Sequence, residues 1–361
     1  MNGAAATGKG AAEEFAERTR RAQAAMRARG LDALFAYSRT RGHVRYLSGY
    51  FPGYLTNWAV LALPQRGDPS LFVRFDFDVE RARAMVGFAQ VRPASELLVV
   101  DPGARRVGVV ARDLAVDEGT PEVWAMARRS YPDAELLDAS DLVLDLRSCK
   151  SEFELARIDR ATRIAQCAAS AMLHSIRPGV SDWELVAAAE SAARCRGAER
   201  ILVLIAVDAD GVVTEPRGAR WNEGDPVQTE ITLSAQGYWT QVNRTFHGKG
   251  VLRGICQAAA EAGRRAARPG SGVQDVVRAV RRHLTSALAP GSRVEYDFGH
   301  GVGCDCPEWP RLIAGGEDAP LREDMVVVVH AGARAPGEDA AFWGGPLQPG
   351  PDGGRWLGEE A

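Results

Sequence analysis

The sequence predicts a protein of two domains, in which a smaller α/β domain precedes a larger α+β domain. The chain has 361 residues, which is about twice the length of a typical domain. Short apolar runs alternate with amphipathic segments before residue 145, as in α/β folds. Beyond it, a pattern of two helices followed by a β-hairpin occurs twice. We therefore expect domains at residues 1–145 and 146–361.

The first domain is expected to begin with a charged amphipathic helix over residues 13–30, which Gly30 can end because glycine readily adopts the left-handed conformation. Four apolar runs of strand length follow, bounded by turn-forming residues. They lie at residues 31–36, 57–63, 70–75 and 106–110. A further helix is predicted over residues 121–129.

The second domain should contain long helices and paired strands. Ser181 precedes a helical pattern and Glu184 stands three residues later, which is the spacing of a capping box. Gly237 separates two strand-like runs and so predicts a hairpin. The other helices are expected at 152–176, 256–268 and 273–288, and the strands at 201–205, 227–233, 238–246, 293–298 and 325–331.

Composition narrows the possible functions. The formal net charge of −3 gives no basic surface for nucleic acid or for an anionic membrane, and no apolar run approaches the length of a membrane span. Residues 1–12 lack the apolar core of a secretory signal, and the six cysteines show no zinc-binding spacing. We therefore expect a cytoplasmic protein with reduced thiols, no cofactor and a small-molecule partner.

Four segments occur in the order and spacing of one known family. They lie at residues 42–50, 146–154, 224–246 and 299–303, and the last reads Gly-His-Gly-Val-Gly. Together they resemble the creatinase/Xaa-Pro peptidase family, over nearly the whole chain. The resemblance implies that the second domain has the pita-bread fold, and that the segment 42–50 forms a strand and a turn. It also implies a homodimer.

The family's metallopeptidases hold two metals with Asp, Asp, His, Glu and Glu, and the resemblance places different residues at most of these positions. Glu230 and Gln241 stand at the two Asp positions, and His300 is retained. His330 stands at the first Glu position, and residues 341–345 offer no carboxylate for the second. Clustered carboxylates normally offset the repulsion between two divalent cations, so this set disfavours a dinuclear site. We expect no metal.

A single metal is an open alternative, because Glu230, His300 and His330 form a set of two histidines and one carboxylate. The creatinase branch of the family works without metal, and residues 237–245 are similar to its hairpin. Asn243 stands where that branch has a carboxylate, and its proton-moving His has no counterpart here. The resemblance therefore implies a substrate other than creatine.

Candidate catalytic residues are His300, His330 and Glu230. An imidazole titrates near neutrality, and two in one cavity can divide the roles of base and acid. Strand alternation puts Gln228, Glu230 and Thr232 on one face, which is either a solvated face or the cavity wall. Further substrate-binding candidates are Gln241, Asn243, Tyr238, Glu308, Arg217 and Glu215.

Aromatic residues gather in the first domain near Pro52 and Gly53. The family pattern implies that this segment of one protomer caps the cavity of its partner, with Phe51 and Tyr54 as the lid. Core packing is the alternative role for these rings.

The leading function is metal-independent cleavage of a C–N bond in a small amino-acid-like, amide or guanidino metabolite, and we expect a role in specialised metabolism. His300 and His330 would activate water and protonate the leaving nitrogen, while Glu230 orients a histidine or holds a cationic group. Two other functions stay open. One is a catalytically inert domain that binds a peptide or protein, and the other is an enzyme with a single metal.

Overall fold

The computed structural model describes residues 9–52, 57–88, 90–98, 100–335 and 339–359. The chain divides into two compact units, Met1–Arg147 and Ser148–Ala361. The second domain was expected to begin at residue 146. Among the described residues, no helix has both the length and the apolar character needed to cross a membrane.

The first unit is built on a six-stranded mixed sheet in the order β4-β3-β2-β1-β5-β6. Apolar side chains of β1 and β5 and of helix α4 form its core, with Phe35 packed edge-on to Tyr131. The elements are α1 (Lys9–Arg29), β1 (Ala33–Ser38), α2 (His43–Ser48), β2 (Ala59–Pro64), β3 (Ser70–Val73), α3 (Val79–Met85), β4 (Val91–Pro93), β5 (Arg106–Val110), α4 (Pro121–Ser130), β6 (Glu135–Asp138) and α5 (Ser140–Ser148).

The segment 42–50 differs from its expected strand and turn. It forms the short helix α2, which ends where Gly49 adopts a φ of 82°. Val44, Tyr46 and Leu47 are all buried, which a single turn of helix achieves when it packs on the sheet. An apolar run this short does not distinguish a helix from a strand.

The second unit contains a nine-stranded sheet whose main path runs β12-β11-β13-β14-β9-β8-β7. This unit follows the predicted pattern of helix pairs and hairpins. Its elements are α6 (Glu152–Ser175), α7 (Asp182–Arg194), β7 (Arg200–Ala206), β8 (Pro226–Ala235), β9 (Tyr238–His247), α8 (Val251–Ala266), α9 (Val273–Ala287), β10 (Arg293–Glu295), β11 (Gly299–Gly301), β12 (Glu308–Arg311), β13 (Val327–Ala335), β14 (Asp339–Gln348) and β15 (Arg355–Trp356).

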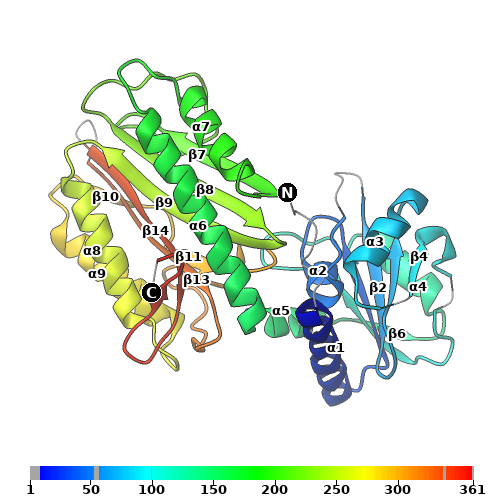
Figure 1. Cartoon of the computed structure of the whole chain (residues 1–361). Helices are drawn as coiled ribbons and strands as arrows, with labels where there is room; N and C mark the ends of the chain where they lie inside the picture. Colours follow the sequence, from blue (N-terminus) through cyan, green and yellow to red (C-terminus); the bar gives the residue numbers. More distant parts are fainter. Residues whose placement is uncertain (1–8, 53–56, 89, 99, 336–338, 360–361) are drawn as a thin grey trace. The chain divides into compact units, whose positions relative to one another are not determined.

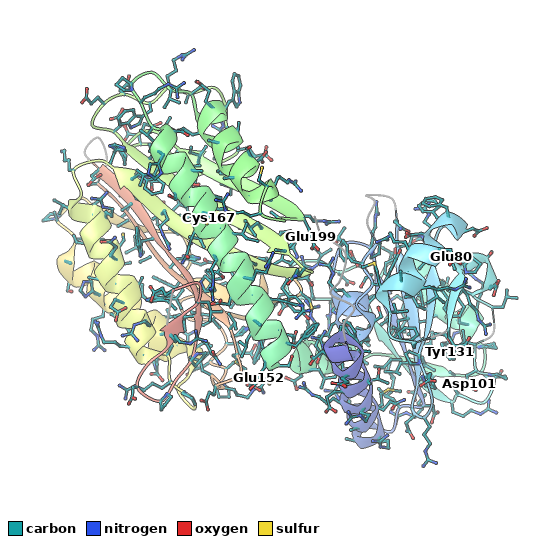
Figure 2. All side chains as sticks on the ribbon, in the orientation of Figure 1. Glu80, Asp101, Tyr131, Glu152, Cys167 and Glu199 are labelled. Carbon is teal, nitrogen blue, oxygen red and sulfur yellow. The ribbon has the colours of Figure 1, made fainter. Side chains whose placement is uncertain are left out.

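Two helix pairs cover the sheet of the second unit (Figure 1). Helices α6 and α7 pack on β7, β8 and β9, and α8 and α9 pack on β13 and β14, so each pair has its own apolar cluster. The capping box predicted at Ser181 and Glu184 is present and starts α7. Figure 2 shows Glu152 at the start of α6 and Cys167 further along it.

Two strands differ from the expectation in ways that shape the site. The strand expected over residues 293–298 ends at Glu295, because Tyr296 adopts a left-handed φ of 65° that breaks the extended chain. Strand β7 lies at the edge of the main sheet path, and Leu202 is 43% exposed, so this apolar strand is only partly buried.

Candidate functional site

A cavity of about 460 Å³ opens on the second unit. Its walls combine acidic, imidazole, amide, thiol and aromatic side chains with one apolar residue from the edge strand. The lining residues are Leu202, Glu230, Thr232, Gln241, Tyr296, Asp297, His300, Cys306, Pro307, His330 and Phe342. The cavity thus holds the three side chains that the sequence indicated as catalytic.

Strand pairing explains how distant residues reach one place. Leu204 pairs with Glu230, Glu230 with Asn243, Asn243 with Gly344, and Gly344 with His330. These residues therefore form one row across five neighbouring strands. Glu230 and His330 stand three strand spacings apart in this row, which is about 14 Å between backbones.

Gly344 makes room for His330. A Cβ atom at Gly344 would lie 2.5 Å from the Cβ of His330 and 2.3 Å from the carbonyl oxygen of Val329. No side chain fits there without moving the histidine. The close approach of β13 and β14 at this point therefore requires glycine at position 344.

The glycines around His300 allow strands to approach closely, as the sequence predicted. Gly299 has a φ of 131°, and a Cβ atom there would lie 1.9 Å from the carbonyl oxygen of Val328. At Gly301 the corresponding atom would lie 2.3 Å from the carbonyl oxygen of Trp309. The two glycines thus position His300 between β12 and β13.

Both ring nitrogens of His300 face oxygen atoms. Nδ1 lies 2.9 Å from the carbonyl oxygen of Gly301, and Nε2 lies 3.0 Å from Oε1 of Gln241. Both contacts are satisfied at once only if the ring carries two protons. Burial lowers the pKa of His300, so the ring is neutral at and above neutral pH. A neutral ring with its proton on Nδ1 needs a donor at Nε2, which a half-turn of the Gln241 amide supplies when the Asn243 amide turns with it, so that Nδ2 of Asn243 then donates to Gln241.

His330 is held differently. It is 3% exposed, and its Nε2 lies 3.4 Å from Oδ1 of Asp297. Burial and the neighbouring His300 lower the pKa of His330 to about 3. Asp297 opposes this shift, but it is also within 3.5 Å of Arg311 and its side chain is 30% exposed, so burial dominates. Within the part of the chain that the structure describes, Nδ1 of His330 has no hydrogen-bond partner.

Glu230 is the third candidate catalytic residue, and its side chain is a carboxyl group that lines the cavity. Among the residues that the structure describes, its one side-chain hydrogen bond comes from the hydroxyl of Thr232, which donates to Oε1 over 3.4 Å. Burial, with a smaller contribution from the charge of Asp297, raises the pKa of Glu230 to about 7. The group can therefore change its charge near neutral pH.

Several cavity residues were not singled out by the sequence. Asp297 and Tyr296 lie in the segment that was expected to be a strand, and their positions depend on the break in β10. Phe342 was seen only as part of a segment without carboxylates. Cys306 also lines the cavity and donates to Oε1 of Gln241 over 3.7 Å. An acidic residue three positions before His300 is the signal that could have indicated Asp297.

The structure does not bring five of the substrate-binding candidates to the cavity wall. Asn243 and Tyr238 are buried, and the side-chain oxygen of Asn243 accepts a hydrogen bond from the Gln241 amide over 3.3 Å. Glu215 and Arg217 are exposed, on a segment where Asp182 accepts a hydrogen bond from the backbone of Arg217.

The fifth candidate, Glu308, forms an ion pair and a hydrogen bond outside the cavity. Its carboxylate forms a 2.9 Å ion pair with Lys150 and accepts a hydrogen bond from the backbone of Asp305. Both side chains of the ion pair are at most 4% exposed. Glu308 does not line the cavity. Its ion pair instead holds in place the segment from which Cys306 and Pro307 reach the cavity wall.

The expected lid residues belong to the first unit. Phe51 is only 7% exposed, and the guanidinium carbon of Arg45 lies 4.2 Å from the centre of its ring. This packing fits the alternative of a core role for Phe51. Tyr54 lies outside the described residues.

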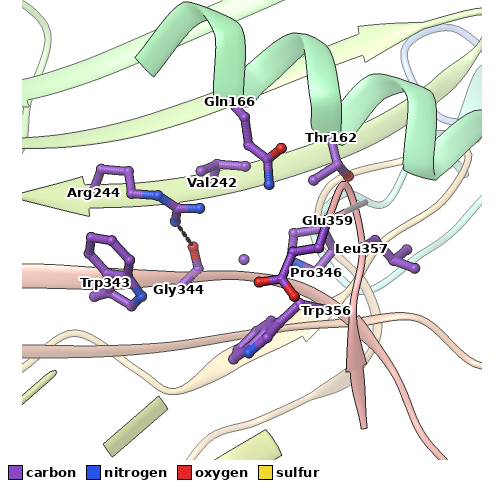
Figure 3. Close-up of a pocket in the computed structure, with 11 residues that line it drawn as sticks. Thr162, Gln166, Val242, Arg244, Trp343, Gly344, Pro346, Trp356, Leu357 and Glu359 are labelled. Carbon is purple, nitrogen blue, oxygen red and sulfur yellow. Dashed lines mark hydrogen bonds between the residues drawn. The ribbon is translucent and has the colours of Figure 1, made fainter. Parts of the chain in front are cut away.

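A second, smaller cavity lies on the opposite face of the same strands (Figure 3). Arg244 enters it from β9, as strand alternation with Asn243 predicts, and donates to the carbonyl oxygen of Gly344 over 2.7 Å. Its guanidinium carbon lies 4.5 Å from the centre of the Trp343 ring. Thr162 and Gln166 of α6 close the space, so Arg244 stabilises the helix-covered side of the sheet.

Comparison with known proteins places the fold and the family. The model of metallopeptidase family M24 matches residues 156–348, and that of the creatinase/prolidase N-terminal domain matches residues 18–149. The chain therefore belongs to metallopeptidase family M24, a family of hydrolases, and its second unit has the pita-bread fold. The predicted family and fold class are confirmed.

Individual relatives are distant. The Xaa-Pro dipeptidase of Pyrococcus horikoshii is 27% identical over 212 residues, which are 56% of this chain and 60% of that protein. An uncharacterised peptidase of Bacillus subtilis, YqhT, is 26% identical over 324 residues, covering 85% of this chain and 88% of the relative. The prolidase structure from Pyrococcus horikoshii superimposes with a TM-score of 0.81 at 20% identity, over 96% of this chain and 99% of that one.

The family name implies metal ions, and the donor set of this cavity does not fit them. Only one carboxylate, Glu230, stands at the five positions that hold ligands in the family's pattern, whereas two divalent cations need clustered carboxylates to offset their repulsion. Nε2 of His300 faces the Gln241 side chain, and the imidazole centres lie 6.4 Å apart. Among the described residues, no three His, Cys, Asp or Glu side chains converge as metal ligands.

Proposed function

We propose that this protein hydrolyses a C–N bond in a small amino-acid-like, amide or guanidino metabolite, with imidazole groups instead of metal ions moving the protons. One observation carries the proposal: His330 faces Asp297 through one nitrogen and has no hydrogen-bond partner at the other, within a cavity shared with His300. A specialised metabolic role, a cytoplasmic location and a homodimer remain predictions from the sequence.

His330 acts first as the base. Burial keeps its ring neutral across the physiological range, so the carboxylate of Asp297 must raise the basicity of the ring as the proton is transferred. A proton on Nε2 points to Asp297, and the lone pair on Nδ1, a buried atom, takes a proton from a water molecule that must move in beside it. The resulting hydroxide adds to the carbonyl or amidine carbon of the substrate, and the carboxylate of Asp297 stabilises the imidazolium.

The same imidazole then acts as the acid. When the C–N bond breaks, the proton on Nδ1 passes to the leaving nitrogen, and His330 is again neutral. The products are the oxygenated carbon fragment and an amine, so the reaction consumes one water and needs no other reactant.

We assign to Gln241, positioned by His300, the stabilisation of the negative charge that develops on the substrate oxygen. When His300 is neutral its Nε2 accepts one N–H of the Gln241 amide, and the second N–H can face the substrate oxygen. Asn243 lies beside Gln241 on the same face of β9 and is buried. The sequence suggested that both histidines move protons, whereas this geometry favours His330 for proton transfer and His300 for positioning.

Turnover of a panel of small amides, amidines and Xaa-Pro dipeptides tests the proposal. We expect at least one compound to be hydrolysed, and the His330→Gln variant to lose about 100-fold or more in kcat. His174→Gln, the same change at an exposed position on α6, is the control and should leave kcat unchanged. Equal kcat for wild type and His330→Gln would contradict the mechanism.

A further inference from the structure

We propose that Glu230, together with the stacked rings of Tyr296 and Phe342, forms a subsite for a cationic nitrogen group, and that ligands with a free carboxylate are excluded from the cavity. The inference names the substrate class for the proposed function and rests on it for turnover. Binding can be measured without any reaction.

The carboxyl of Glu230 is the uncompensated charge of the cavity. In the part of the chain that the structure describes it has no ion-pair partner, and the Thr232 hydroxyl is a neutral donor at 3.4 Å. The other cavity carboxylate, Asp297, is shared between His330 and Arg311. A cation beside Glu230 would supply the charge-assisted hydrogen bond that the protein itself does not.

No basic side chain offsets this charge at the cavity wall. The lining residues include neither lysine nor arginine among those that the structure describes. Burial lowers the pKa values of His300 and His330, so neither ring supplies a positive charge at neutral pH. A ligand carboxylate would therefore meet two like charges and no cation.

The aromatic pair gives the subsite a second means of recognition. Tyr296 and Phe342 stack with ring centres 4.3 Å apart, and the backbone N–H of Val213 donates to the Tyr296 hydroxyl over 3.2 Å. Burial raises the pKa of Tyr296, and the charge of Glu230 adds a smaller contribution. Aromatic faces beside a carboxylate attract planar or alkylated cations.

Tyr296 is held in this position at a conformational cost. Its φ of 65° lies in the left-handed region, where a bulky side chain is strained by about 1–2 kcal/mol. The stacking on Phe342 and the contact with Val213 keep the ring there. Such strain is typical of residues that contact ligands.

Three nearly isosteric probes separate charge from shape. Benzamidine is cationic, benzamide neutral and benzoate anionic, and a cavity of about 460 Å³ accommodates a single-ring ligand of this size. Isothermal titration of the full-length protein at pH 8 should show benzamidine binding at least about 10-fold more tightly than benzamide, with no binding of benzoate.

Glu230→Gln should weaken benzamidine binding by about 10- to 100-fold and leave benzamide binding unchanged. Glu223→Gln, at an exposed position before β8, is the matched control and should bind all three probes like wild type. Equal or tighter binding of benzoate, no binding of benzamidine at millimolar concentration, or no effect of Glu230→Gln would each overturn the inference. Because these are equilibrium measurements, they leave the proton-transfer mechanism to be judged by turnover alone.

Discussion

Nε2 of His330 and Oδ1 of Asp297 lie 3.4 Å apart, and this contact joins strand β13 to the segment that precedes β11. A carboxylate at this distance fixes the orientation of the ring and favours its protonated form during proton transfer. The pair depends on Tyr296, because the left-handed backbone there turns the chain and brings Asp297 to the cavity.

Asp297→Asn is expected to lower kcat by about 100-fold, because the amide cannot stabilise the imidazolium. Steady-state kinetics on any hydrolysed substrate measures this, with circular dichroism to confirm folding. KM should change by less than threefold or so, since Glu230 and not Asp297 is assigned to substrate binding. A variant that raises only KM would place Asp297 in binding.

Gly344→Ala is expected to destabilise the protein by about 1–3 kcal/mol and to displace His330, because the added Cβ would lie 2.5 Å from the Cβ of the histidine. Gly345→Ala is a stringent control, since its nearest contact would be the carbonyl oxygen of Gln241 at 4.0 Å. Urea unfolding should separate the two variants. Equal stabilities would show that Gly344 is not required for the position of His330.

Lys150→Met is expected to cost about 3–5 kcal/mol of unfolding free energy, because it leaves the buried carboxylate of Glu308 without its partner. Arg278→Met removes a cation from an exposed ion pair with Asp275 and should change stability by less than about 1 kcal/mol. Thermal unfolding monitored by circular dichroism compares them. A small effect at Lys150 would mean that the segment carrying Cys306 is anchored by other contacts.

The charge of Glu230 predicts a pH dependence. Its pKa is raised to about 7, so the carboxylate that binds a cation forms as the pH rises through about 7, and kcat/KM for a cationic substrate should rise with it. The titratable and charged groups that face Glu230 or its neighbours are Asp297, His300, His330, Tyr296, Cys306 and Arg311. In the Glu230→Gln variant, kcat/KM for a cationic substrate should no longer rise as the pH increases through about 7.

The stability of the folded protein should fall as the pH rises, whereas kcat/KM for a cationic substrate should increase. Because the folded-state pKa of Glu230 lies above the usual value of 4.5, the folded protein holds this proton more tightly than the unfolded chain. That contribution is fully present below about pH 4.5 and is lost as the pH rises through about 7. Glu230→Gln should therefore be about 1–3 kcal/mol more stable than wild type at pH 8, and not at pH 4. Unchanged stability at pH 8 would contradict a buried, uncompensated carboxylate.

Much of the fold could be predicted because local signals and tertiary packing agree. The helices that begin after Ser151 and Ser181 have capping boxes, and the hairpin around Gly237 has a turn that requires a positive φ. Strand alternation grouped Glu230 with Thr232 on one face of β8, and both side chains line the cavity.

The remainder of the site depends on contacts that sequence spacing does not encode. Asp297 reaches His330 only because β10 ends early, and Glu308 is withdrawn from the cavity by an ion pair with Lys150, which is 158 residues away. The short helix α2 was missed because its apolar residues lack a distinguishing period.

The most direct test of the account is hydrolysis by metal-free protein. The protein is treated with a strong chelator, its residual metal content is measured by elemental analysis, and the turnover of a cationic amide is compared before and after addition of Mn²⁺, Co²⁺ or Zn²⁺. We predict the same rate, within about twofold, in all of these states, and its loss in His330→Gln. Turnover that disappears on chelation and returns with stoichiometric metal would contradict the central claim.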